Sequence, residues 1–122
     1  MKKLLEHTRR PDITFRRNGQ ILITARVARI LSLRPGDSIN IACAAGEYLL
    51  YAVHRNSCTG RHIARCYRTN KSGNNFCANS VDLCRSILAI ANVSTDRVSL
   101  MTGEAITSGD TVYLPLITRR PL

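Results

Sequence analysis

Residues 19–41 of the chain read GQILITARVARILSLRPGDSINI, and this stretch decides the fold. It begins at an Asn-Gly step with Asn18, a dipeptide typical of two-residue hairpin turns because both residues tolerate positive φ. Apolar residues alternate on both sides of that step, as they do in half-buried strands. The pattern therefore predicts a β-hairpin over residues 13–23, with Arg16 and Arg17 near its tip.

The same stretch continues with a short helix and a turn. Thr24 is placed to cap a helix over residues 25–32, in which the apolar residues share one face while Arg26 and Arg29 share another. The Arg-Pro-Gly-Asp sequence that follows is typical of a turn. An alternating pattern over residues 38–41 then predicts a strand, so the order is hairpin, helix, turn and strand.

The second half of the chain repeats this order of elements. It predicts a helix over residues 81–91, capped by Asn79 or Ser80, and strands over residues 97–101 and 111–116. The likeness between the halves is compatible with a degenerate internal repeat and equally with chance. The predicted organisation has four parts: a flexible basic arm (1–12), a small β-rich domain (13–53), a basic loop or linker (54–72) and a second repeat or dimerisation element (73–118).

The chain is strongly basic, and its charge is uneven. Eighteen Lys and Arg against 8 Asp and Glu give a net charge of +10 over 122 residues, and fifteen of the basic residues are Arg. The net charge is +6 over residues 1–40, +4 over residues 41–75 and zero over residues 76–122. A positive potential attracts polyanions, and Arg presents a planar fork of donors suited to phosphates and guanine edges. We therefore expect a nucleic-acid site in the first two thirds of the chain.

The cysteines indicate a reduced compartment rather than a disulfide framework. The chain has five of them: Cys43, Cys58, Cys66, Cys77 and Cys84. Their odd number, without a secretory signal before them, favours a cytoplasmic location. No Cys-x-x-Cys pair is present, so we expect no metal site from the last four cysteines with His54 and His62. Cys77 and Cys84 fall in apolar patterns and are expected to be small core residues.

No sequence pattern of an enzyme is present. The chain has no nucleophile motif, phosphate-binding loop or carboxylate pair, and Glu47 and Glu104 lie in predicted turns. No apolar stretch approaches the length that spans a bilayer. We therefore expect a protein that is not an enzyme and has no cofactor and no membrane partner.

Residues 13–53 resemble the swapped-hairpin domain of the AbrB, SpoVT and MazE-type DNA-binding family. The shared pattern is a Gly followed by an alternating Ile strand, then a short helix ending in Leu-x-Leu, then an Arg-Pro-Gly-Asp turn that enters a strand. The resemblance implies an α+β, β-rich fold: a swapped-hairpin β-barrel with short helices, in one or two copies per chain. In that family two copies interleave their hairpins, which implies a homodimer. About forty residues with one short helix cannot bury an adequate core alone, which also favours such pairing.

Two residues depart from the family's pattern. Thr24 stands where the family usually has Pro, and Gln20 stands where many members carry Arg. The barrel tolerates both changes, but the loss of a basic group at Gln20 weakens the expected DNA contact there. Arg29 matches the second residue of a basic pair on the family's short helix, while Ala28 replaces the first.

The candidate nucleic-acid contacts are arginines in two groups. The first group surrounds the predicted hairpin and helix, and the second lies in the basic stretch that follows residue 53. The eight residues are Arg16, Arg17, Arg26, Arg29, Arg55, Arg61, Arg65 and Arg68. Most of them are expected to hold phosphates, while one or two read base edges. The alternative for both groups is a solvated basic surface.

The sequence thus predicts a duplex DNA-binding protein, a transcriptional regulator of the AbrB-like type. The alternative is a protein-interaction module, either antitoxin-like or an assembly protein, whose partner binds residues 73–118 and whose basic face is incidental. RNA binding is a third hypothesis, because a low aromatic content argues only weakly against it. Salt dependence separates these hypotheses, since binding to nucleic acid weakens steeply with salt.

Overall fold

The computed structural model describes residues 11–54, 64–70 and 73–122. Most of the basic arm predicted over residues 1–12 therefore lies outside the described residues. The same holds for part of the predicted linker and for four residues discussed above: Arg55, Cys58, Arg61 and His62.

The first half of the chain forms two β-hairpins joined by a short helix. Its elements are β1 (Ile13–Arg16), β2 (Gln20–Ile23), α1 (Ala25–Ile30), β3 (Ser38–Ala44) and β4 (Glu47–Val53). The hairpin predicted over residues 13–23 is confirmed, as are the helix after it and the strand that begins at residue 38. Thr24 occupies the N-cap position but makes no capping hydrogen bond with its side chain. The Asn75 side chain caps this helix instead, since its Oδ1 accepts the N–H of Ala25 at 2.8 Å.

The second half has the same order with shorter opening strands. Its elements are β5 (Ala64–Arg65), β6 (Tyr67–Arg68), β7 (Phe76–Asn79), α2 (Val81–Ile90), β8 (Arg97–Thr102), β9 (Ile106–Ser108) and β10 (Thr111–Ile117). The predicted cap Ser80 is confirmed, because its Oγ accepts the N–H of Leu83 at 3.2 Å. At Cys66 the extended segment breaks into β5 and β6, because the Cys66 N–H donates to the Asp37 carbonyl at 2.7 Å instead of to a strand.

The predicted turn at Gly103 and Glu104 is wrong. The chain does not reverse there, because β9 continues along the same strand β10 that β8 pairs with. Gly103 donates its N–H to the carbonyl of Pro115 at 2.8 Å, but Pro115 has no N–H to return. The ladder is therefore interrupted at this point and resumes in β9, and the reversal occurs at Gly109.

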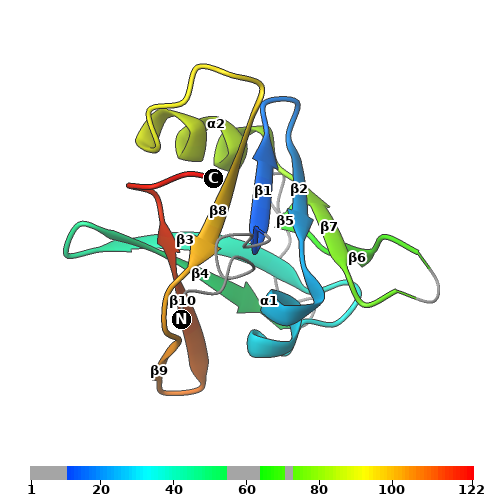
Figure 1. Ribbon diagram of the computed structural model, residues 1–122. Helices are drawn as coiled ribbons and strands as arrows, with labels where there is room; N and C mark the ends of the chain where they lie inside the picture. Colours follow the sequence, from blue (N-terminus) through cyan, green and yellow to red (C-terminus); the bar gives the residue numbers. More distant parts are fainter. Residues whose placement is uncertain (1–10, 55–63, 71–72) are drawn as a thin grey trace, which may run out of the picture.

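The strands form a nearly closed, antiparallel, barrel-like sheet with two short helices (Figure 1). Along the sheet the order is β5-β3-β4-β10-β8-β1-β2-β7-β6, with β9 paired to β10. The two ends of this order, β5 and β6, are successive in the chain and are separated only by Cys66. The two ends of the nearly closed barrel are therefore joined by one bent segment. The β-rich fold with short helices predicted from the sequence is confirmed.

Strands from the two halves alternate around the barrel. The β1–β2 hairpin lies between β8 and β7, while the β3–β4 hairpin lies between β5 and β10. No pairing joins the β1–β2 hairpin to the β3–β4 hairpin directly. Exchanging β1 with β5 and β6, β2 with β7, β3 with β8 and β9, and β4 with β10 leaves this set of pairings unchanged. Each half therefore completes the sheet of the other.

The two helices end in the same way. After α1, Ser32 has a φ of 54°, and the N–H of Leu33 donates to the carbonyl five residues back at 2.8 Å. After α2, Asn92 has a φ of 57°, and the N–H of Val93 makes the corresponding hydrogen bond at 2.9 Å. A left-handed residue followed by such a backward hydrogen bond is a common helix stop. Neither residue is Gly, so the local sequence alone indicates this geometry only weakly.

The core is aliphatic and draws on both halves. Its largest side chains that are almost fully buried include Phe15, Ile21, Leu50, Ile87, Leu100 and Leu114. Cys84 is buried as predicted from its apolar pattern, whereas Cys77 is only half-buried. Among the described residues, no helix is long and apolar enough to cross a membrane.

Candidate nucleic-acid interface

The turn between β1 and β2 is held against the second half of the chain. The Arg17 N–H donates to the Asp96 carbonyl at 2.7 Å, and its guanidinium donates to the Thr95 carbonyl at 2.9 Å. On the other side of the turn, the Ser80 N–H donates to the Gly19 carbonyl at 2.8 Å. The turn therefore lies beside the start of α2 and the loop before β8, at the upper end of the barrel in Figure 1.

Gly19 makes this close approach possible. Its φ is +106°, which L side chains rarely adopt, and an added Cβ would lie 2.9 Å from Cγ2 of Val81. The Asn-Gly dipeptide that predicted the hairpin turn thus also positions the turn on α2. Arg16 and Arg17 are carried on a turn with backbone contacts on both sides.

Two arginines lie directly opposite each other where β1 and β8 pair. Arg16 is the partner of Arg97 in the antiparallel register. Like charges at opposite positions of a sheet destabilise it. The Arg16 guanidinium donates to Oε1 of Gln20 at 3.0 Å, and among the described residues no carboxylate forms an ion pair with Arg16 or Arg97. The structure therefore places two arginines at opposite positions of adjacent strands, with no ion-paired carboxylate on either among the described residues.

These arginines border a hollow of about 540 Å³ at the upper end of the barrel. It is lined by Arg16, Arg17, Asn18, Asp96 and Arg97. Three guanidinium groups and one carboxylate give the hollow a positive charge. We define these five residues as the arginine hollow.

No family model, no curated protein and no solved structure matches this chain. The resemblance to the swapped-hairpin family therefore rests on the sequence pattern of residues 13–53 alone.

Arg26 and Arg29 lie on α1, at the other end of the β1–β2 hairpin from the arginine hollow (Figure 1). Arg26 forms an ion pair with Asp12 at 3.1 Å and donates to Oγ1 of Thr102 at 3.3 Å. Arg29 is exposed in the last turn of α1. The four arginines predicted around the hairpin and helix are therefore divided between two ends of the barrel, and Arg26 already has an internal partner.

Two arginines of the second predicted group lie in β5 and β6. Arg65 and Arg68 are both exposed, and Arg65 is opposite Ser38 of β3. When the two halves are exchanged, Arg65 of β5 corresponds to Arg16 of β1, and Ser38 of β3 corresponds to Arg97 of β8. Among the described residues, the second position therefore has a serine in place of one arginine and no pair of opposed charges. Arg55 and Arg61 lie outside the described residues.

Sequence reasoning missed Arg97 and Asp96. Both lie within residues 76–122, whose net charge is zero, so the charge distribution gave no reason to expect a nucleic-acid site there. They reach the site because β8 pairs with β1, a pairing between residues more than eighty positions apart. The only local signal for this site was that Arg97 is a basic residue at the start of a predicted strand.

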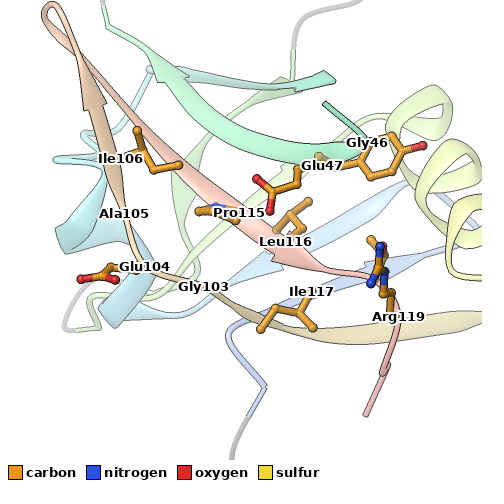
Figure 2. A pocket seen from close by; sticks show the side chains of 12 residues that line it. Gly46, Glu47, Gly103, Glu104, Ala105, Ile106, Pro115, Leu116, Ile117 and Arg119 are labelled. Atoms are coloured by element: carbon orange, nitrogen blue, oxygen red, sulfur yellow. The ribbon is translucent and has the colours of Figure 1, made fainter. Parts of the chain in front are cut away.

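A larger hollow of about 570 Å³ has a different character (Figure 2). Glu47 and Glu104 both line it, together with the exposed apolar side chains of Ile106 and Ile117. Arg119 lies at its edge. Carboxylates repel phosphates, so this hollow does not suit a polyanion.

The described cysteines and histidine do not form a metal centre. Cys43, Cys66, Cys77 and Cys84 are free thiols, and within the described ranges no three His, Cys, Asp or Glu side chains are grouped to hold a metal. Burial raises the pKa of the Cys66 thiol to about 12, which keeps it protonated and unreactive. The ring of His54 contacts Oδ2 of Asp37 through Nδ1 at 2.8 Å.

Proposed function

We propose that the protein binds duplex DNA and acts as a transcriptional regulator of the AbrB-like type, with the arginine hollow holding phosphates. The observation that carries this proposal is the pair Arg16 and Arg97, which are opposite each other on adjacent strands and have no ion-paired carboxylate among the described residues. Juxtaposed like charges are unfavourable in the free protein. An anion bound between them relieves that repulsion and gains charge-assisted hydrogen bonds.

Arginine rather than lysine suits this role. A guanidinium presents donors in a fixed fork that matches the oxygens of a phosphate. Two of the three guanidiniums are already oriented by hydrogen bonds, Arg16 to Gln20 and Arg17 to the Thr95 carbonyl. Oriented side chains lose less conformational freedom when a ligand binds. The net charge of +10 adds a long-range attraction for DNA.

The proposal includes a duplicated architecture, in which two swapped-hairpin units are fused in one chain. Three features support it: the alternation of strands from the two halves, the pairings that survive their exchange, and the matched helix ends at Ser32 and Asn92. In such an architecture the second half supplies the hairpins that a second subunit supplies in the family. The homodimer expected from the sequence is then unnecessary for barrel closure.

The test is a titration of random-sequence duplex DNA at several salt concentrations. Wild type is compared with the triple variant Arg16→Ala/Arg17→Ala/Arg97→Ala. We expect log affinity to fall with log salt, and the slope to lose about 0.9 for each phosphate contact removed. Circular dichroism of each variant establishes that the barrel is still folded.

A charge-matched control separates the hollow from the overall charge. The variant Arg29→Ala/Arg65→Ala/Arg68→Ala removes the same charge from exposed positions elsewhere on the barrel. We expect it to lose less affinity and less slope than the hollow variant. Equal losses would assign binding to net charge and not to the hollow. No binding by wild type at low salt would refute the proposal.

The alternative function is binding of a protein partner, and the hollow at Glu47 and Glu104 favours it. Its exposed side chains Ile106 and Ile117 are 47% and 39% accessible. A partner held there by apolar contacts binds with little salt dependence, unlike DNA. Glu47→Ala/Glu104→Ala leaves DNA binding intact under the main proposal.

A further inference from the structure

We propose that Asp96 is a specificity-determining residue, whose carboxylate accepts a hydrogen bond from the exocyclic amino group of cytosine in the major groove. This inference rests on the proposed DNA-binding function and deepens it. It concerns the one acidic member of the arginine hollow.

Asp96 lies near three arginines but forms no ion pair with them. Three arginines line the same hollow, yet among the described residues Asp96 forms no ion pair within 4.0 Å. Asp12 shows the contrast, since its carboxylate is bound by Arg26 and Thr102. Asp96 thus lines a cationic hollow, and its exposed side chain remains available as a hydrogen-bond acceptor.

The position of Asp96 is fixed by the backbone. Its carbonyl accepts the Arg17 N–H at 2.7 Å, and the next residue, Arg97, begins β8. The hydroxyl of the neighbouring Thr95 donates a hydrogen bond to the Arg97 carbonyl at 3.0 Å. These contacts fix the backbone from which the exposed Asp96 side chain projects, and a group that reads a base edge requires such support.

A carboxylate beside phosphate-binding arginines cannot itself hold phosphate. An ionised carboxylate only accepts hydrogen bonds, and phosphate oxygens repel it. On the DNA surface its suitable partners are amino groups, and the pairing of Asp with cytosine N4 follows from major-groove geometry. Guanine presents acceptors at the same edge and is therefore rejected.

The effect of Asp96 on affinity and its effect on specificity have opposite signs. Removing its negative charge strengthens binding to the phosphate backbone of any duplex. The same change removes the acceptor that distinguishes cytosine from guanine. We expect a discrimination of about tenfold at one base pair in wild type, and its loss without Asp96.

The experiment selects bound duplexes from a random library and then measures the affinity of the selected sequence and its cytosine-to-guanine variant. It compares wild type, Asp96→Ala and Asp110→Ala. Asp110 is a matched control, since it is exposed and lies outside the arginine hollow. Alanine at residue 96 preserves the backbone carbonyl that Arg17 contacts.

The expected result is a cytosine preference in wild type and Asp110→Ala that is absent in Asp96→Ala, which binds random duplex more tightly. If Asp96→Ala binds more tightly but retains the preference, Asp96 only repels phosphate and this inference is overturned while DNA binding stands. If wild type binds duplex DNA without any base preference, this inference is likewise overturned while DNA binding stands. Absence of any duplex binding by wild type removes both proposals.

Discussion

The Asp12 carboxylate accepts two hydrogen bonds from Thr102, one from its N–H and one from its hydroxyl, each of 2.9 Å. Asp12 directly precedes β1, and Thr102 ends β8. Both residues are buried, so the pair joins the two halves of the chain at the end of the barrel remote from the arginine hollow. The ion pair with Arg26 extends this junction to α1.

We expect Asp12→Ala to lower the free energy of unfolding by about 2–4 kcal/mol, since it leaves the buried N–H of Thr102 without its acceptor. Arg26→Ala should lower it by less than about 1 kcal/mol, because the Arg26 side chain is 55% exposed and solvent screens the ion pair. Urea unfolding of the two variants measures both values. Equal losses would mean that the ion pair, and not the hydrogen bonds to Thr102, stabilises this junction.

The positive φ of Ser32 and Asn92 predicts an unusual substitution pattern. Ser32→Val and Asn92→Val should each destabilise the protein by about 1–2 kcal/mol, because a β-branched side chain is strained in this conformation. Ser32→Gly and Asn92→Gly should be neutral or slightly stabilising. Thermal unfolding of the four variants checks the pattern. A valine variant as stable as its glycine counterpart would contradict the left-handed geometry.

Two buried thiols predict a loss of stability at high pH. Burial raises the pKa of Cys66 to about 12 and that of Cys84 to about 11, from about 9 in the unfolded chain. The contribution of the two thiols to the free energy of unfolding is complete below pH 9. Above it the unfolded chain loses protons that the folded protein keeps, so the free energy of unfolding falls by up to about 1.4 kcal/mol per pH unit and thiol.

The measurement is urea unfolding from pH 8 to pH 11, with Cys66→Ala/Cys84→Ala as control. The comparison concerns the slope against pH, so a constant loss of stability in the variant does not affect it. We expect a shallower decline in the variant, and identical slopes would show that the two thiols do not carry the effect.

The pairing pattern predicts that neither half folds alone as a monomer. In a fragment of residues 1–54, the β1–β2 hairpin loses its partners β7 and β8, and the β3–β4 hairpin loses β5 and β10. Isolated hairpins are marginally stable in water. Circular dichroism and sedimentation should therefore show no folded monomer of this fragment. A cooperative unfolding transition from such a monomer would argue against a barrel shared between the halves.

Most elements of the fold were predictable because their signals are local. The Asn-Gly step, the Ser80 cap and the alternating strands each act within a few residues. The strand β9 was missed for the opposite reason. The break at Gly103 depends on Pro115, which lies across the sheet and cannot return a hydrogen bond. Thr24 lost its capping role for a similar reason, since Asn75 reaches Ala25 from the other half.

The candidate site was predictable only in part. Charge concentration pointed to Arg16 and Arg17, and both line the arginine hollow. The same reasoning grouped them with Arg26, which the fold places at the other end of the hairpin against Asp12. It also passed over Arg97, because the last third of the chain has no net charge.

By itself, the sequence determined the basic character of the protein, its aliphatic core and the order of its hairpins and helices. These follow from composition and from short-range periodicity, which are present in the unfolded chain. Only the tertiary structure decided that strands of one half pair with those of the other, that Arg97 faces Arg16, and that Asp96 joins them. Those relationships connect residues far apart in the chain, and they arise because neither half can satisfy its strand edges or bury its apolar face alone.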